Sequence, residues 1–492
     1  MLTETQFADL KKQDFTHIPF VEEVLADFDT PLSTYYKLAR EPYTYLFESV
    51  QGGEKWGRFS IIGLPTSTRI EVYDDTVCVA KADKVLKKWV SEDPLQDIRE
   101  FHDSFKIPML DGLPKFTGGL VGFFGYDTIR YIEPKLRNGR KARDIDIPDI
   151  CLMVSDEVVV FDNLSGRLFV LVHVNVSRGE DWECGRKRIS QILSQLKEPV
   201  QSRPALSLQR EADESEFESS FGRESFEAAV EKTREYILAG DAFQVVLSQR
   251  LSAKYTGSPI DLYRALRTLN PSPYMYYLNF GAYHIVGASP EILVRAEDGV
   301  VTVRPLAGTR PRGVDEECDK LLEAELLADE KERAEHVMLV DLGRNDVGRV
   351  SALGSVKVND VMQIERYSHV MHIVSNVTGK LNDDMHAIDV LRATLPAGTV
   401  SGAPKVRAME IIDELEPHKR CIYSGAVGYL GWNGNIDTAI AIRTAVLHKG
   451  RVYVQAGAGL VADSVPSTEW RECLHKAQAL LRAVAMAKDC KE

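Results

Sequence analysis

Hydrophobic and polar positions in the first 197 residues follow the short alternating runs typical of β-strands. Three such runs occupy residues 151–155, 158–161 and 168–174. The turn cluster at residues 163–166 separates the last two, which predicts a β-hairpin. Residues 187–197 have the apolar spacing of an amphipathic helix. This half is therefore predicted to be mainly sheet, closed by a helix.

The C-terminal half combines predicted strands with longer helical periods. Strands are predicted at residues 243–251, 276–280, 284–288, 301–305, 424–431, 436–446 and 451–456. Helices are predicted at residues 226–239, where Gly240 suits a helix end, and at about 318–342, 406–415 and 467–487. Short turns such as Asn433-Gly434 imply antiparallel pairing. The pattern predicts an α+β fold in layers.

Residues 198–222 are rich in Pro, Ser, Gln and acidic residues and lack apolar periodicity. We interpret them as a linker or crossing segment between an N-terminal region, 1–197, and a C-terminal region, 223–492. A length of 492 residues also favours two or three domains.

Composition excludes several function classes. A net charge of −13 argues against general binding of nucleic acid or of an anionic membrane. The N-terminus has no apolar signal segment, and no run approaches a membrane span. The seven cysteines are scattered without a C-x-x-C pair. We therefore expect a reduced, cytoplasmic protein that acts outside membranes.

Two glutamate pairs, Glu332/Glu335 and Glu469/Glu472, are the strongest candidates for chemistry. A spacing of three residues on a helix places both carboxylates of a pair on one face. Four converging carboxylates need a cation, and oxygen-only ligands favour Mg²⁺. Lys476 falls on the same face as the second pair and could hold a substrate carboxylate. The alternative for these residues is a solvated helix face with a surface Glu–Lys pair.

Small residues mark two further candidate binding segments. Gln455-Ala-Gly-Ala-Gly459 would let a ligand approach the backbone, although a tight turn explains it equally well. Residues 397–405 precede a helix and could form an anion site, but they do not match a nucleotide-binding phosphate loop.

Two titratable residues stand in strand-like surroundings. Glu291 follows a predicted strand, where partial burial would raise its pKa and suit it to act as a general acid. His372 lies in an apolar alternation, where a histidine is more often a satisfied core residue than a functional one.

In this order, these segments resemble the chorismate-utilising enzymes over about residues 225–483. The segments that carry the resemblance are GDAFQVVLSQR (240–250), GASPEIL (287–293), RPLAGTRPRG (304–313), DEKERAEHVMLVDLGRND (329–346), HVMHIVSNVTG (369–379), LPAGTVSGAPK (395–405), YSGAVGY (423–429), IAIRT (440–444), QAGAG (455–459) and STEWRECLHKA (467–477).

Two positions separate the chemistries within that superfamily. Isochorismate and salicylate synthases have a water-activating lysine where this chain has Gln244, and aminodeoxychorismate synthases typically have a lysine where it has Ala307. Gln244 with Ala307 is similar to the anthranilate synthase component I family, whose fold is a four-layer α/β/β/α sandwich of largely antiparallel sheets. The N-terminal segments Leu46–Ser49 and Trp56–Gly63 and the segment Asn270–Met275 resemble that family's tryptophan site.

The resemblance implies an Mg²⁺-dependent lyase that converts chorismate and ammonia to anthranilate and pyruvate, with feedback inhibition by L-tryptophan. It assigns Glu332, Glu335, Glu469 and Glu472 to the metal; Glu291, His372, Gln244 and Thr309 to catalysis; Gly308, Thr309, Thr399, Tyr423, Arg443, Gly457, Ala458, Gly459 and Lys476 to the substrate; and Glu48, Ser49, Arg58, Pro273, Tyr274 and Met275 to tryptophan.

The chain contains no Gly-x-Cys-x-Gly-x-Gln glutaminase motif. A separate glutaminase subunit is therefore expected to deliver ammonia, in a heterodimer or heterotetramer. The alternatives are an aminodeoxychorismate synthase component, an anthranilate synthase of secondary metabolism, and a non-catalytic tryptophan-sensing module. Intact glutamate pairs with Glu291 and His372 argue against the last, because a sensor needs none of them.

Overall fold

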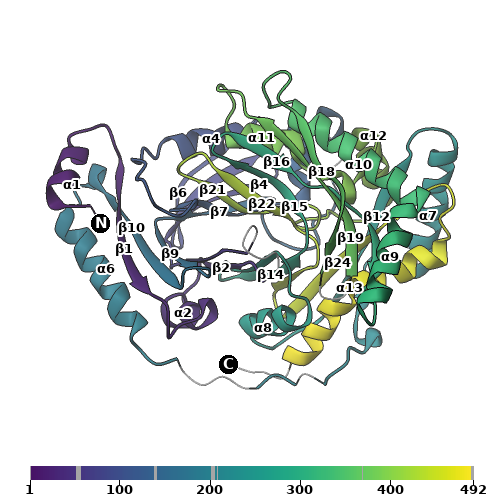
Figure 1. The fold of residues 1–492 in the computed structure, drawn as a ribbon, viewed down its shortest axis with the longest axis horizontal. Helices are drawn as coiled ribbons and strands as arrows, with labels where there is room; N and C mark the ends of the chain where they lie inside the picture. The colour runs from purple at the N-terminus through teal and green to yellow at the C-terminus, as the bar shows by residue number, and fades with distance from the viewer. Residues whose placement is uncertain are drawn as a thin grey trace.

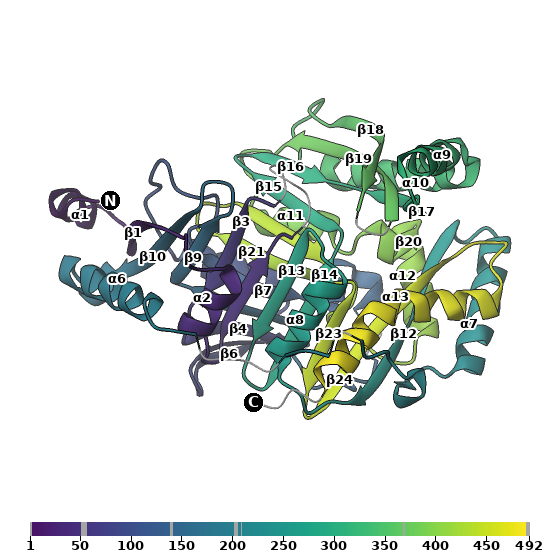
Figure 2. The ribbon, with the colours of Figure 1, turned by 60° about the horizontal axis from the view of Figure 1, so that its bottom comes forward.

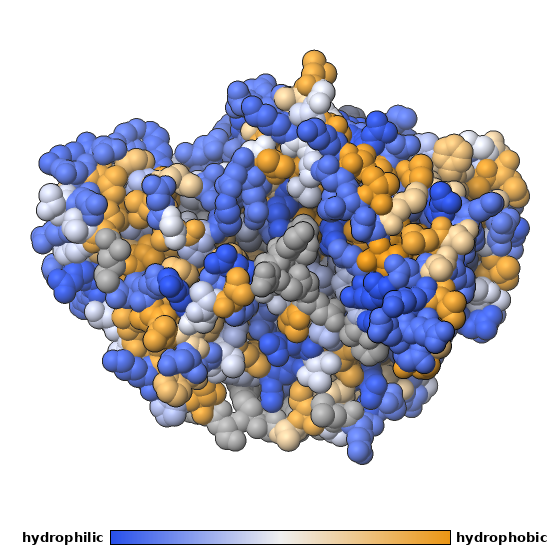
Figure 3. Space-filling model, viewed as in Figure 1, coloured by the Kyte–Doolittle hydropathy of each residue, from blue (hydrophilic) through white to orange (hydrophobic). Residues whose placement is uncertain are grey.

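The computed structural model describes residues 2–50, 57–137, 141–200, 205–207, 209–367 and 370–488. Trp56 and His369 of the segments quoted above lie outside these residues. None of the described helices has both the length and the apolar character that a membrane span requires. Hydrophobic and hydrophilic residues are intermixed on the face shown in Figure 3.

Two twelve-stranded sheets, antiparallel throughout the described residues, form the centre of the molecule (Figures 1 and 2). The first contains, in spatial order, β1 (His17–Leu25), β10 (Arg167–Asn175), β9 (Glu157–Asp162), β3 (Phe59–Gly63), β2 (Thr44–Glu48), β13 (Tyr274–Asn279), β14 (Tyr283–Ser289), β23 (Thr444–His448), β24 (Arg451–Leu460), β12 (Gln244–Lys254) and β11 (Glu218–Ser219), with β20 (Gly402–Ala403) also paired to β12. The second contains β17 (Leu306–Pro311), β19 (Val370–Lys380), β16 (Val300–Val303), β15 (Ile292–Glu297), β22 (Ile436–Ile440), β21 (Ala426–Gly431), β7 (Gly119–Phe124), β8 (Ile150–Ser155), β4 (Thr68–Tyr73), β5 (Thr76–Lys81) and β6 (Lys84–Val90), with β18 (Lys357–Arg366) paired to β19.

Helices cover the outer faces of both sheets, as Figure 1 shows. The first sheet packs on α1 (Glu4–Lys11), α2 (Pro31–Leu38), α6 (Trp182–Leu196), α8 (Pro259–Leu269) and α13 (Pro466–Ala487). The second packs on α4 (Pro94–Asp103), α10 (Glu330–Gly348) and α11 (Ala387–Thr394). Three further helices, α5 (Ile129–Ile132), α7 (Arg223–Leu238) and α12 (Lys405–Leu415), pack near the end of β12, and α9 (Glu316–Ala328) contacts β17. A third apolar core, which includes Phe123, Leu278 and Val427, fills the space between the sheets. This arrangement confirms the predicted α/β/β/α fold class.

Both halves of the chain contribute to both sheets. The N-terminal and C-terminal strands meet where β2 pairs with β13 and where β7 pairs with β21. Figure 2 shows the purple N-terminal strands continuing into the green and yellow strands of the C-terminal half. The division into residues 1–197, 198–222 and 223–492 stays a prediction, but the two regions share their cores. Within the crossing segment, β11 pairs with β12.

Two predicted elements were wrong in detail. The helix predicted at 318–342 is two helices, α9 and α10, because the side chain of Asp329 caps α10 by accepting from the backbone N–H groups of Lys331 and Glu332. The strand predicted at 436–446 is β22 and β23, which lie in different sheets. The helix predicted at 467–487 is α13, which begins at Pro466 after Val465 at the N-cap.

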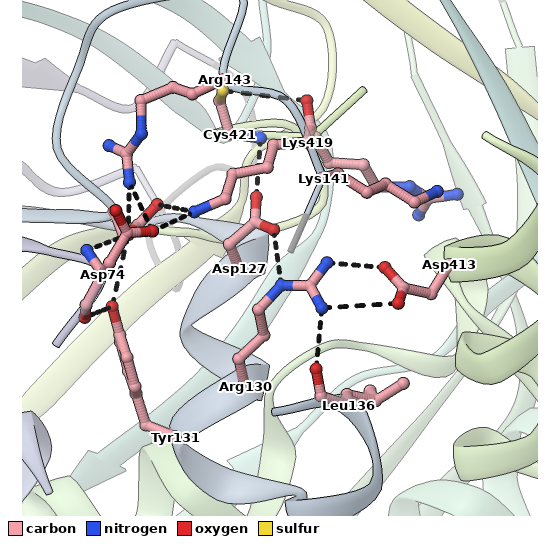
Figure 4. Close-up of polar contacts among 12 residues, drawn as sticks. Asp74, Asp127, Arg130, Tyr131, Leu136, Lys141, Arg143, Asp413, Lys419 and Cys421 are labelled. Carbon is pink, nitrogen blue, oxygen red and sulfur yellow. Dashed lines mark hydrogen bonds and ion pairs between the residues drawn. The ribbon is translucent and has the colours of Figure 1, made fainter. Parts of the chain in front are cut away.

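A buried ion-pair network joins the N-terminal half to the segment before β21 (Figure 4). The ammonium of Lys419, with a side chain only 4% exposed, donates to Asp74 at 2.8 Å and lies 3.4 Å from Asp149. Nearby, Arg130 donates to Asp413 at 2.6 Å and to Asp127 at 3.1 Å. These contacts neutralise carboxylates that would otherwise be buried without a counter-charge.

We expect Lys419→Met to lower the free energy of unfolding by about 3 kcal/mol, because the buried carboxylate of Asp149 loses one of its two cations and keeps only Arg143. The midpoint of urea unfolding measures the loss. The matched control is Lys449→Met: Lys449 also pairs with an aspartate, Asp146, but its side chain is 69% exposed. That variant should change stability by less than about 1 kcal/mol. Equal effects of the two substitutions would contradict a stabilising role for the network.

Candidate functional site

Two chain crossings between the sheets bring a carboxylic acid and a guanidinium to one place. β14 of the first sheet leads into β15 of the second through Glu291, and β22 leads back to β23 through residues 441–443. The N–H of Ala288 donates to the carbonyl of Arg443 at 3.1 Å. The N–H of Ile440 donates to the carbonyl of Glu291 at 3.0 Å. Arg443 turns the chain in a left-handed conformation with φ of +48°.

The surroundings of Glu291 keep its carboxyl group protonated at neutral pH. It is 8% exposed, and burial raises the pKa of its carboxyl from 4.5 to about 8. The hydroxyl of Thr399 donates to its Oε1 at 3.1 Å, and that bond, a backbone bond from Leu306 and the charge of Arg443 only partly oppose the rise. A neutral carboxylic acid next to a cation can donate its proton to a leaving group.

His372 lies opposite a bulge in the neighbouring strand. The register of β17 against β19 shifts between Ala307 and Thr309, and Gly308 takes a φ of +67° there. Nδ1 of His372 lies 2.9 Å from the Gly308 carbonyl and 3.1 Å from the Thr309 hydroxyl. Because a carbonyl only accepts, Nδ1 carries the proton and Nε2 keeps a lone pair. Burial lowers the pKa of His372, so the ring is neutral.

The first glutamate pair lies at the start of α10. Nε2 of Gln244, on β12, donates to Oε1 of Glu335 at 3.1 Å. Burial and the neighbouring charges of Glu335 and Asp329 raise the pKa of Glu332. Arg310 is 3.7 Å from Glu332, a distance too long for a hydrogen bond. These carboxylates therefore repel one another and attract a cation.

The second pair lies at the start of α13. Glu469 is 8% exposed, and burial raises its pKa, as does Glu472. The charge of Lys331, from α10, lowers that pKa, which shows that the starts of the two helices approach each other. Lys476 pairs with Oε1 of Glu472 at 2.7 Å and donates to the carbonyl of Gly457 at 3.1 Å.

The donor set fits a hard divalent cation. All four donors are carboxylates, and burial together with repulsion within each pair raises the pKa of Glu332 and Glu469. Among the described residues, no three of the four gather their oxygens within 4.8 Å of one another. Shared coordination with waters and an anionic substrate suits such an open arrangement. The assignment of these residues to Mg²⁺ stays a prediction.

β24 leaves space for a ligand beside Tyr423 and Gln244. A Cβ atom at Gly457 would lie 2.8 Å from the Tyr423 hydroxyl, and one at Gly459 would lie 2.8 Å from Nε2 of Gln244. Ala458, between them, is fully buried and faces the other side of the strand. Because glycine has no side chain at these two positions, an anion could reach the backbone and the polar side chains of Tyr423 and Gln244.

A separate cavity of about 200 Å³ lies between the two sheets. Its walls include the six residues predicted for an effector: Glu48, Ser49, Arg58, Pro273, Tyr274 and Met275. Segments from both halves of the chain thus meet there. The carboxylate of Glu48 is already bound by Arg267, at 3.0 and 3.1 Å, and by the Tyr263 hydroxyl. Arg58 is held in the same way by Asp162, at 3.0 and 2.7 Å.

Sequence reasoning missed the charged wall of this cavity. Asp437 on β22 accepts from the Tyr274 hydroxyl at 2.9 Å and from Arg295 at 2.7 and 3.0 Å. The available signal was a charged residue within an apolar strand: Arg295 in ILVRAE and Asp437 in IDTAI. Such residues are rarely buried unless they pair with each other or serve a site.

The family model of chorismate binding enzymes matches residues 45–482. The chain is 56% identical over 492 residues to anthranilate synthase component 1 of Pseudomonas aeruginosa, covering 100% of both chains. The chain belongs to the anthranilate synthase component 1 family of chorismate-binding enzymes. Identity to the component 1 protein of Neisseria meningitidis serogroup A is 53%, over 99% of both chains. The crystal structure of anthranilate synthase component I from Streptococcus pneumoniae superposes with a TM-score of 0.78 at 40% identity, covering 94% of this chain and 99% of that one.

Membership of the anthranilate synthase component 1 family confirms the resemblance drawn from the ten segments. It also favours this family over the aminodeoxychorismate synthases, as Gln244 and Ala307 indicate. The roles of individual residues stay predictions, which the geometry above makes specific.

We expect the proton on Glu291 to make stability depend on pH. Between pH 4.5, its ordinary pKa, and about 8, the folded chain holds a proton that the unfolded chain releases. The free energy of unfolding therefore falls as pH rises through this window. Glu291→Gln removes that contribution, so its unfolding temperature should fall less between pH 5.5 and pH 8.5 than that of the native chain.

The control is Glu330→Gln, at an exposed position on α10. It should keep the pH dependence of the native chain. If Glu291→Gln keeps it as well, Glu291 is ionised at neutral pH and cannot serve as the proton donor.

Proposed function

We propose that this chain converts chorismate and ammonia to anthranilate and pyruvate, with Mg²⁺ as cofactor and L-tryptophan as inhibitor. Full-length similarity to the anthranilate synthase component 1 family supports the reaction. The observation that carries the mechanism is the buried, protonated carboxyl of Glu291 near the charge of Arg443, where the chain crosses between the sheets. Because the chain lacks a glutaminase motif, a separate subunit supplies ammonia from glutamine.

The substrate is a dicarboxylate, and the pocket offers a separate set of groups for each carboxylate. Arg443 and Tyr423 bind the enolpyruvyl carboxylate, since a guanidinium suits bidentate pairing with it. The backbone of Gly457–Gly459 and the ammonium of Lys476 hold the ring carboxylate. Bound Mg²⁺, held by Glu332, Glu335, Glu469 and Glu472, supplies charge neutralisation for that carboxylate.

Glu291 protonates the departing C4 hydroxyl while ammonia attacks C2. Thr399 fixes the orientation of the carboxyl group, and burial keeps it protonated until the leaving group accepts the proton. His372 presents the lone pair of Nε2 near the ring, positioned by the Gly308 carbonyl, while Thr309 lines the pocket beside it. Gln244 is bonded to Glu335 and cannot act as a base, which suits ammonia as the nucleophile.

We expect anthranilate fluorescence to appear when the chain is mixed with chorismate, Mg²⁺ and ammonium at alkaline pH. Glu335→Gln and Glu472→Gln should each lower the rate by at least about 100-fold, because a lost ligand weakens the metal and leaves the substrate carboxylate without its counter-charge. Circular dichroism checks that both variants remain folded.

Glu330→Gln, at an exposed position on the same helix as Glu335, is the matched control and should retain its rate. Glutamine in place of ammonium should give no product with the isolated chain. Retained turnover in a folded Glu335→Gln variant would refute the metal assignment. Chorismate consumed without anthranilate would point to an aminodeoxychorismate synthase, and no consumption at all would favour a tryptophan-sensing module.

Tryptophan should bind in the cavity between the sheets. We expect Ser49→Leu to weaken binding by at least about 10-fold, since the larger side chain fills space that the indole needs. Isothermal titration calorimetry measures the affinity. Glu335→Gln, outside this cavity, should bind tryptophan like the native chain. Unchanged affinity in Ser49→Leu would place the effector elsewhere.

A further inference from the structure

Two histidines and an aspartate meet outside the active site, between α4 and α11. His102 and Asp103 end α4, and His386 directly precedes α11. Nε2 of His386 lies 3.3 Å from Nδ1 of His102 and 3.4 Å from Oδ1 of Asp103. Nδ1 of His102 lies 3.6 Å from the same oxygen. The three atoms therefore form a nearly equilateral triangle. Among the described residues, His102, Asp103 and His386 are the group of potential metal ligands whose atoms lie this close together.

These distances match three corners of a tetrahedral metal site. Metal–ligand bonds of about 2.0–2.1 Å place neighbouring ligand atoms about 3.3 Å apart. Two imidazoles and a carboxylate, with a fourth position left open, suit zinc and its first-row neighbours. We propose that His102, Asp103 and His386 bind one divalent ion of the zinc class, which joins α4 to α11. The site differs from the oxygen-only glutamate set, which favours Mg²⁺.

His102 is already oriented as a ligand. Its Nε2 donates to the carbonyl of Gly431 at 3.0 Å, so the lone pair lies on Nδ1, which faces the other two groups. Its ring stacks on Trp432 with centroids 5.4 Å apart, and the residue is 5% exposed. A backbone carbonyl that fixes the second ring nitrogen is the usual outer partner of a metal-binding histidine.

Asp103 gives the ion a path from solvent. Its side chain is 54% exposed, and its nearest cation, Arg99, is 3.9 Å away. Arg99 donates instead to Asp389 at 3.1 Å. The carboxylate is therefore free to turn toward a metal, and a water molecule can complete the tetrahedron on this side.

His386 exchanges one interaction for another when the ion binds. Its Nδ1 now accepts from the backbone N–H of Ile388 at 3.1 Å and so caps α11. Coordination of the ion by Nε2 moves the ring proton to Nδ1. A protonated Nδ1 can no longer accept from the N–H of Ile388, so the cap is lost. The helix remains tied to α4 through the metal and through the Arg99–Asp389 and Arg392–Asp93 pairs.

The test is a titration of the full chain with Co²⁺ in saturating Mg²⁺, followed by visible absorption, with Zn²⁺ as competitor. We expect one equivalent with a tetrahedral spectrum that Zn²⁺ abolishes. Asp103→Asn should weaken binding by at least about 10-fold. The matched control Glu100→Gln, exposed on the same helix, and the active-site variant Glu335→Gln should bind like the native chain. Absence of that equivalent, or unchanged affinity in Asp103→Asn, would overturn the proposal.

His386→Asn separates metal binding from the helix cap. Asparagine is among the best N-cap residues, so this variant keeps a cap while losing the imidazole. Zn²⁺ should raise the unfolding temperature of the native chain, because a ligand of the folded state stabilises it. That rise should disappear in His386→Asn. A rise that persists, or a cobalt spectrum dominated by sulfur ligation, would place the ion on other residues and refute the site.

Discussion

The geometry of the proposed active site depends on one buried ion pair, between Arg420 and Glu416. Their side chains are 1% and 3% exposed, and the guanidinium donates to both carboxylate oxygens, at 2.6 and 2.9 Å. Arg420 also donates to the carbonyls of Val400 and Val246, at 2.8 and 2.7 Å. Glu416 accepts from the N–H and the hydroxyl of Ser248, both at 2.8 Å. One pair thus fixes the segment that contains Thr399 and the strand that begins with Gln244.

The same guanidinium also contacts Tyr423, one of the residues proposed to bind the substrate. The guanidinium lies 5.5 Å from the ring of Tyr423, and the hydroxyl of Tyr423 lies beside Gly457 of β24. A buried pair contributes little net stability, because desolvation offsets the attraction, but loss of one partner is expensive. The role of the Arg420–Glu416 pair is therefore to fix positions. It holds β12, β24 and the segment that contains Thr399 in one arrangement before substrate binds. Preorganisation of this kind places polar groups where charge develops during reaction.

Much of the layer architecture was predictable, because apolar alternation and turn residues are local signals. The glutamate pairs were predictable for the same reason, since helical spacing alone puts each pair on one face. The crossing at residues 441–443 was not predictable from pattern: IDTAIAIRTAVLH contains no Gly, Pro or Asn that would signal a turn, and only the backbone φ of Arg443 divides it. The break at Asp329 was missed because Asp is common on helix surfaces as well as at caps.

Shared sheets also give the proposed effector cavity a route to the proposed active site. Tyr274, from the cavity wall on β13, donates to Asp437 on β22 of the other sheet. Three residues further along β22, the N–H of Ile440 donates to the carbonyl of Glu291. A ligand that shifts Tyr274 therefore acts on the strand that positions the acid. Such a path transmits regulation only if the ligand binds two arrangements of β22 with different affinity. The crossing that follows Ile440 carries this route to Arg443, which makes the turn between the sheets with its left-handed φ.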